Sequence, residues 1–134
     1  MSDESRDKKT AISSAEAPQA IGPYSQAVRA GDLVFCSGQI PLDPATGVLV
    51  DGGFSVQARR VLDNLAAVLR ATGLGMNDVV RTTIYLADLA DFAEVNRIYA
   101  EYFTAPYPAR STLQAAALPK GARLEIDVIA RARG

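Results

Sequence analysis

The chain has 134 residues, of which 49% are apolar and 22% are charged, and its 14 basic and 15 acidic residues leave a formal charge of −1. This composition is typical of one folded domain and too apolar for a disordered chain. There is no basic excess to bind a phosphate backbone, which counts against a nucleic-acid-binding role. The sequence contains no histidine, which excludes Ser-His-Asp and Cys-His mechanisms and histidine-ligated metals within this chain. The single cysteine, Cys36, excludes an intrachain disulfide and a thiolate metal cluster.

The first ten residues, MSDESRDKKT, are polar and mix both signs of charge. We therefore expect a flexible N-terminal tail over residues 1–10 and a single domain over residues 11–134. The apolar stretch that a secretory signal requires is missing from this tail. The longest unbroken apolar run is five residues, 65–69, far short of a membrane span of about 20 residues. A cytoplasmic protein is the expectation.

Short strands and turns are predicted in the first part of the chain. A strand is expected at 11–13, and a hairpin is expected from strands at 27–30 and 33–37 around the turn dipeptide Gly31-Asp32. Residues 41–47 read PLDPATG, which is typical of a loop. This part of the sequence shows no internal repeat.

Helical periodicity dominates the middle of the chain. Apolar residues recur at i, i+4, i+7, i+8 and i+11, namely Phe54, Ala58, Val61, Leu62, Leu65, Val68 and Leu69. Gly73 is placed to end this helix. Residues 79–87 are rich in β-branched and aromatic side chains and predict a strand.

A second helix is predicted over about residues 91–103, stopped by the prolines that follow. Asp91 with Glu94 fits a capping box, although Asp88 could instead open the helix. Two further strands, at 111–116 and 123–131, close the chain.

This order of elements predicts an α+β fold in which two helices cover one face of a single sheet. In the last strand, one face carries Leu124, Ile126 and Val128, and the other carries Glu125, Asp127 and Ile129. If the first set meets the helices, the second set is left for solvent or for another subunit. We therefore predict an oligomer with a carboxylate in its interface.

Arg110 and Glu125 are the leading candidates for chemistry. Arg110 follows the stiff Pro106-Tyr107-Pro108 segment, and a rigidly held guanidinium suits a carboxylate ligand. Glu125, if buried at an interface, could hold or deprotonate a water. The spacing alone favours plainer structural roles for both. Arg110 would then be a surface arginine or a structural ion pair, and Glu125 an exposed strand residue or a salt-bridge partner.

Other polar positions give weaker signals. Tyr24 after a Gly-Pro turn could cap a pocket or simply pack the turn, and Gly38 would let a ligand approach the backbone. Cys36 is best explained as a buried strand cysteine, since no histidine is present to activate it. Asn96 could contact a neighbouring subunit or face solvent. No glycine pattern matches a nucleotide-binding loop, so no nucleotide cofactor is suggested.

Several segments together resemble the RidA (YjgF) family. PARSTL at 108–113, LP at 118–119 and LEIDVIA at 124–130 resemble its C-terminal signature, and AIGPYSQA at 20–27 resembles its N-terminal motif. The segments 37–41, 57–59, 62–64 and 91–96 also fit in order. The resemblance covers residues 11–133, nearly the whole chain.

The resemblance implies a chorismate-mutase-like α+β fold and a homotrimer with active clefts between subunits. It implies hydrolysis of reactive 2-imino or enamine acids, such as 2-iminobutyrate and 2-iminopropionate, to 2-oxo acids and ammonia. It also implies that the reaction needs neither a metal nor an organic cofactor. The expected partners are a small 2-imino or 2-oxo acid and further copies of the chain, without nucleic acid or membrane.

The resemblance also assigns roles to residues. Arg110 would bind the substrate carboxylate and Glu125 would activate water. Gly38 and Thr112 would offer backbone N–H groups, Tyr24 and Ser37 would line the cleft, and Asn96 would act from the adjoining subunit. The imine deaminases often have cysteine where this chain has Thr112.

Three other functions remain open from the sequence, one of which is a related deaminase that acts on another carbon–nitrogen bond. A non-catalytic trimer that binds 2-oxo acids would need Arg110 but not Glu125. An endoribonuclease and translation inhibitor, a label that some family members carry, would lack the histidine that RNA cleavage usually employs and has no visible basic stripe.

Overall fold

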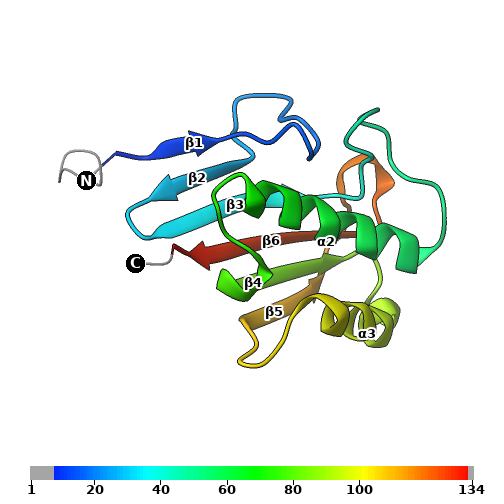
Figure 1. Cartoon of the computed structure of the whole chain (residues 1–134). Helices are drawn as coiled ribbons and strands as arrows, with labels where there is room; N and C mark the ends of the chain where they lie inside the picture. The colour runs from blue at the N-terminus through cyan, green and yellow to red at the C-terminus, as the bar shows by residue number, and fades with distance from the viewer. Residues whose placement is uncertain (1–7, 133–134) are drawn as a thin grey trace.

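The computed structural model describes residues 8–132, which form a mixed sheet with two helices on one of its faces (Figure 1). The elements in chain order are β1 (Thr10–Ile12), β2 (Ala27–Ala30), β3 (Leu33–Gln39), α2 (Phe54–Arg70), β4 (Val79–Leu86), α3 (Phe92–Tyr102), β5 (Ala109–Gln114) and β6 (Leu124–Arg131). Short 3-10 turns occupy Met76–Asp78, Leu89–Asp91 and Pro119–Gly121. The predicted α+β class is confirmed.

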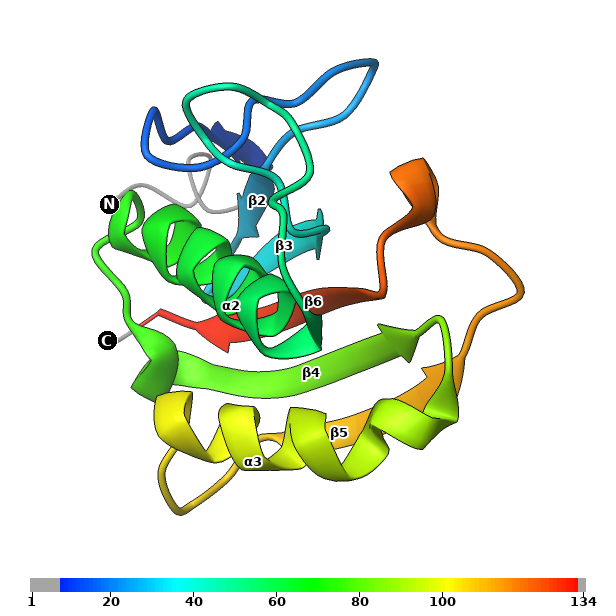
Figure 2. The ribbon, with the colours of Figure 1, turned by 90° about the vertical axis from the view of Figure 1, so that its right-hand side faces the viewer.

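The sheet has six strands in the order β1-β2-β3-β6-β4-β5. Only β4 and β5 run parallel, and α3 makes the crossover between them, as parallel strands require. The last strand in sequence, β6, pairs with both β3 and β4 and so joins the two halves of the chain. Figure 2 shows the connection from β5 to β6, with its 3-10 turn, standing out at one end of the sheet away from both helices.

The predicted element boundaries are close to those observed. The hairpin of β2 and β3 turns at Gly31 with a positive φ of 60°, but β3 runs on to Gln39, two residues beyond the prediction. The strand β1 begins at Thr10, one residue earlier than the strand predicted at 11–13. Residues 1–7 of the expected tail lie outside the described part of the chain.

The helix α2 ends as the sequence predicts. The Leu74 N–H donates to the Leu69 carbonyl at 3.0 Å and the Gly73 N–H donates to the Arg70 carbonyl at 3.0 Å. This pair of bonds is a Schellman motif, which requires a left-handed residue, and Gly73 has a φ of 79°. The chain therefore leaves the helix at a fixed angle toward β4.

The start of α3 follows the second of the two predicted alternatives. The Asp88 carboxylate accepts the Ala90 N–H at 2.8 Å and opens a 3-10 turn that leads into α3. Asp91 caps nothing with its side chain, so the capping box with Glu94 is wrong. The Asp91 carboxylate instead accepts hydrogen bonds from the guanidinium of Arg123, which lies just before β6.

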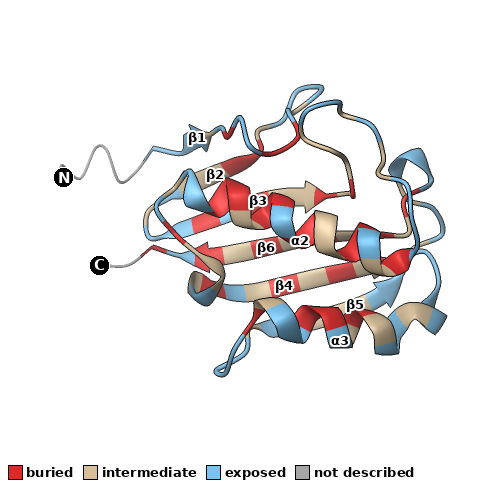
Figure 3. Ribbon diagram, turned by 45° about the vertical axis from the view of Figure 1, so that its right-hand side comes forward, coloured by how far each residue is buried: buried red, intermediate tan, exposed pale blue. Residues whose placement is uncertain are grey.

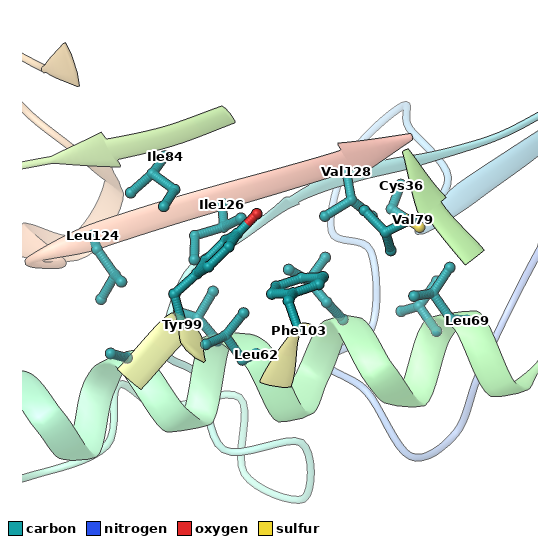
Figure 4. Close-up of a cluster of buried hydrophobic side chains, with 14 of the residues drawn as sticks. Cys36, Leu62, Leu69, Val79, Ile84, Tyr99, Phe103, Leu124, Ile126 and Val128 are labelled. Atoms are coloured by element: carbon teal, nitrogen blue, oxygen red, sulfur yellow. The ribbon is translucent and has the colours of Figure 1, made fainter. Parts of the chain in front are cut away.

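The core lies between the two helices and the covered face of the sheet (Figures 3 and 4). Leu62, Leu65 and Leu69 of α2 are fully buried against β6, where Ile126 is fully buried as well. The Tyr99 ring of α3 and the Phe103 ring just after it pack with centroids 4.3 Å apart, and Figure 4 shows both among the other core side chains. Cys36 is buried here, as predicted, and burial together with the nearby Asp127 charge raises the pKa of its thiol to about 12.

Truncation of this core gives a stability prediction. Leu62→Ala is expected to lower the free energy of unfolding by about 3 kcal/mol, because it removes buried methyl groups and leaves a cavity. Val56→Ala on the exposed side of the same helix, where 47% of the residue is accessible, serves as the control and should change stability by less than about 1 kcal/mol. Urea unfolding measures both, and equal effects would contradict this assignment of the core.

The opposite face of the sheet carries no helix within residues 8–132. As predicted, Glu125, Asp127 and Ile129 of β6 share this face, and all three are only partly buried. Phe35, which pairs with Ile129, is 42% exposed. A sheet face with exposed large apolar side chains is suited to contact with another protein surface.

Candidate active site

A cavity of about 470 Å³ lies at the end of the sheet where the β5–β6 connection meets the loop before β2. Glu125 of β6 lies at this cavity, and Tyr24 comes from the loop. Its lining residues are Pro18, Gln19, Ile21, Tyr24, Gln26, Gly38, Gln39, Ile40, Leu42, Pro119, Lys120 and Glu125. We call it the glutamate cavity. Most of its wall is apolar, with one carboxyl and one ammonium group.

Gly38 is required for the Glu125 carboxyl to lie where it does. The pairing of β3 with β6 shifts register between Cys36 and Gln39, and Gly38 lies in that irregularity. A Cβ atom built on Gly38 would overlap the Glu125 carboxyl oxygen and lie 2.9 Å from its Cδ. The absence of a side chain at this position therefore lets the carboxyl rest against the backbone of β3.

This contact makes Gly38→Ala an informative substitution. The atoms that clash are at the flexible end of Glu125, so we expect the fold to survive while the carboxyl is displaced. A displacement of this kind should lower kcat/KM for the reaction proposed below by roughly 10²-fold. Gly75→Ala, where an added Cβ meets nothing within 4 Å, is the control. Unchanged activity in Gly38→Ala would show that the position of Glu125 is not critical.

The environment of Glu125 favours its protonated form. Burial raises the pKa of its carboxyl above the ordinary value, and the negative charge of Asp127 raises it further. Lys120 lines the same cavity, yet it makes no ion pair with Glu125 in the described residues. A carboxyl in such surroundings can accept a proton from water and later return it.

Tyr24 and Ser37 have different relations to the glutamate cavity. Tyr24 is 54% exposed at its rim, and its hydroxyl accepts the Ile21 N–H at 3.3 Å. The Ser37 hydroxyl donates to the Ser25 carbonyl at 2.6 Å and ties the loop to β3. Ser37 is not among the cavity-lining residues, so its side chain supports the site from behind.

Arg110 lies in a second, smaller cleft of about 260 Å³. The residues that line it are Asn96, Tyr99, Ala100, Tyr107, Pro108 and Arg110. The guanidinium carbon of Arg110 lies 5.0 Å from the centroid of the Tyr99 ring and 5.7 Å from that of Phe92. These aromatic faces hold the cation without neutralising it. We call this the arginine cleft.

Three polar groups of the arginine cleft region form no hydrogen bond or ion pair among residues 8–132. Arg110 forms no ion pair and no hydrogen bond there, which contradicts its interpretation as a structural ion pair. The side-chain oxygens of Asn96 and Thr112 are buried and make no hydrogen bond. Thr112 follows Arg110 by two residues and therefore lies on the same face of β5. Buried polar atoms are rarely left unsatisfied, so this cluster is suited to a polar ligand.

The glutamate cavity and the arginine cleft are apart within one copy of the chain. Arg110 pairs with Thr82 of β4, whereas Glu125 pairs with Tyr85, three residues further along. An odd separation along a strand places the two side chains on opposite faces, and the offsets along and across the strands are each about 10 Å. A small substrate cannot touch both groups of one copy.

The structure thus sorts the predicted site residues into two groups. Tyr24, Gly38 and Glu125 share the glutamate cavity, and Asn96 lies beside Arg110 in the arginine cleft. Sequence reasoning did not single out Lys120, although its position in a Pro-Lys-Gly turn was visible.

Within residues 8–132, no three acidic or cysteine side chains gather closely enough to hold a metal ion. Over the same range, no helix is both long and apolar enough to cross a bilayer. The cytoplasmic location stays a prediction.

Comparisons with known proteins identify the family. The family model described as endoribonuclease L-PSP matches residues 14–132. The chain is 58% identical over 124 residues to protein DfrA of Myxococcus xanthus, covering 91% of this chain and 95% of that protein. It is 50% identical over 119 residues to human 2-iminobutanoate/2-iminopropanoate deaminase, covering 89% of this chain and 87% of that protein. The crystal structure of RidA from an Antarctic Psychrobacter superposes with a TM-score of 0.88 at 44% identity. The match covers 91% of this chain and 98% of that one. The chain belongs to the RidA/YjgF family.

Proposed function

We propose that the protein hydrolyses reactive 2-imino acids, such as 2-iminobutyrate and 2-iminopropionate, to 2-oxo acids and ammonia. The observation that carries this proposal is the pair of unneutralised groups, the Glu125 carboxyl in the glutamate cavity and the Arg110 guanidinium in the arginine cleft. The first suits a water-activating base and the second suits a substrate carboxylate. Relatives of about 50% identity named 2-iminobutanoate/2-iminopropanoate deaminase support the same reaction.

The separation of these two groups leads to a composite site. We place the arginine cleft of one copy against the glutamate cavity of the next, in a homotrimer. The half-buried face of the sheet, with Phe35 and Leu113 about 40% exposed, offers the surface for this contact. A closed ring of copies forms one such composite site at each interface. In this arrangement Asn96 and Arg110 both act from the copy opposite Glu125.

Each protein group then has a defined task. Arg110 forms a bidentate pair with the substrate carboxylate and fixes the imine carbon against the glutamate cavity. The Asn96 amide oxygen and the Thr112 hydroxyl oxygen are buried without a hydrogen-bond partner, so they are available to the substrate or to an ordered water. Tyr24 at the rim covers the bound molecule.

The reaction proceeds with a single proton carrier. The Glu125 carboxylate takes a proton from water while the water oxygen bonds to the carbon of the protonated imine. Glu125 then gives that proton to the nitrogen of the carbinolamine. The C–N bond breaks as the hydroxyl oxygen forms the carbonyl, and the hydroxyl proton leaves with ammonia as ammonium. Glu125 is regenerated as the carboxylate, and no redox or metal step is needed.

A coupled assay tests the proposal. Threonine dehydratase supplies 2-iminobutyrate, and the appearance of 2-oxobutyrate is followed with and without the protein. We expect faster release with the protein than in buffer. A folded protein that leaves the release rate unchanged at any concentration would contradict the proposal. Binding of 2-oxobutyrate without acceleration would favour the non-catalytic binding module instead.

A further inference from the structure

Asp127 lies beside Glu125 and is held in place from the neighbouring strand. The two carboxyl groups are two residues apart on β6 and share the face of the sheet that carries no helix. Tyr85 of β4 is the register partner of Glu125, yet its hydroxyl donates to the Asp127 carboxylate at 3.1 Å. This diagonal hydrogen bond fixes the Asp127 charge next to the group assigned to water activation.

The charged and titratable groups around Glu125 and Asp127 do not neutralise the negative charge of these two carboxyl groups. Lys120 and Tyr24 approach Glu125 from the turn before β6 and from the loop before β2, and neither forms an ion pair or hydrogen bond with it. Arg81 of β4 shares the same face, but its guanidinium donates to the Ser111 hydroxyl of β5 at 2.7 Å. Within residues 8–132, no cation pairs with either carboxyl of β6.

We propose that Asp127, held by Tyr85, is a positioning residue that sets the pH range over which Glu125 exchanges protons with water and with the departing nitrogen. The inference rests on the proposed hydrolysis. A fixed negative charge two residues away on the same face of β6 disfavours a second negative charge on Glu125. It thereby makes Glu125 a better proton acceptor at neutral pH than an isolated carboxylate.

The electrostatics agree with this geometry. Burial raises the pKa values of Glu125, Tyr85 and Cys36, and the charge of Asp127 raises all three further. The charge of one carboxylate thus affects the pKa values of three groups that lie in different strands. Asp127 itself need not touch the substrate to act in this way.

The pH dependence of kcat/KM tests the role of Asp127. Glu125 must be ionised to act as a base, so activity falls as the pH drops through its pKa. Asp127→Asn keeps an acceptor for the Tyr85 hydroxyl but removes the charge. The acid limb of the profile, where kcat/KM falls at low pH, should therefore move down by about one pH unit. Asp127→Glu retains the charge and should leave the limb near its wild-type position. Asp63→Asn is the matched control, because Asp63 accepts the Tyr102 hydroxyl at 2.9 Å on the helical side.

A second readout does not depend on activity. The Glu125 side-chain carboxyl carbon is titrated by NMR in the assembled protein, with its signal assigned by its loss in Glu125→Gln. The midpoint should fall in Asp127→Asn and not in Asp63→Asn. An Asp127→Asn protein that loses activity with an unmoved acid limb and an unmoved Glu125 titration would overturn the inference and leave Asp127 a merely structural residue. A moved titration in a protein without imine hydrolysis would support the coupling and reject the proposed function.

Discussion

Glu125→Gln is expected to lower kcat/KM for 2-iminobutyrate hydrolysis by roughly 10³-fold, because the amide cannot take a proton from water. The substitution nearly preserves the shape of the side chain, so the glutamate cavity should keep its form. Burial and the Asp127 charge make Glu125 costly to ionise in the wild type, so its replacement by a neutral group should not destabilise the fold. The coupled assay measures the rate, and thermal unfolding measures the stability.

The control for this substitution is Glu101→Gln on α3. Glu101 is exposed and pairs with Arg59 of α2 at 2.8 Å, so its loss should cost less than about 1 kcal/mol of stability and leave activity intact. Retention of most of the activity in Glu125→Gln would show that another group activates water. In that case the arginine cleft would remain the only supported part of the site.

Arg110→Ala is expected to reduce kcat/KM by roughly 10²-fold or more, since two charge-assisted hydrogen bonds to the substrate carboxylate are lost. Arg110→Lys keeps the charge but not the planar pair of donors, and an intermediate loss of about tenfold is expected. Most of the effect should appear in KM, because the carboxylate is bound in the ground state as well. Initial rates over a range of imine concentrations measure this division.

Arg97→Lys is the matched control for the arginine series. Its side chain is 60% exposed on α3 and its guanidinium has only long contacts to Glu94 and Glu101, so the substitution should leave kcat and KM unchanged. Equal losses in Arg97→Lys and Arg110→Lys would indicate a general effect of replacing an arginine by lysine, unrelated to binding of the substrate carboxylate. Such a result would contradict a specific carboxylate site at Arg110.

Local patterns in the sequence predict most of the elements. The periodicity of the segment that became α2 and the glycine after it depend on contacts within a few residues, so both the helix and its end could be located. The start of α3 was less determined, because Asp88 and Asp91 are both good capping residues and the nearby Arg123 decides between them. Because Arg123 is distant in sequence, its contact with Asp91 could not be predicted from the local pattern.

The arrangement of the candidate site could be predicted only in part. Alternation in β6 correctly placed Glu125 and Asp127 together on one face. The face occupied by Arg110 depends on the register of β5 against β4, which is set by long-range pairing and has no local signal. The sequence therefore named both groups but could not show that one copy holds them on opposite faces. The close approach of Gly38 to Glu125 likewise depends on an irregularity between β3 and β6.

Subunit complementation tests the composite site most directly. Arg110→Ala and Glu125→Gln proteins, each nearly inactive, are unfolded together, refolded as a mixture and assayed for imine hydrolysis. If the site is shared between copies in a ring, about a quarter of the interfaces should regain an intact Arg110 and an intact Glu125, and activity should return to about that fraction of the wild-type value. A mixture that refolds into the same assembly and remains as inactive as its parents would contradict the composite site.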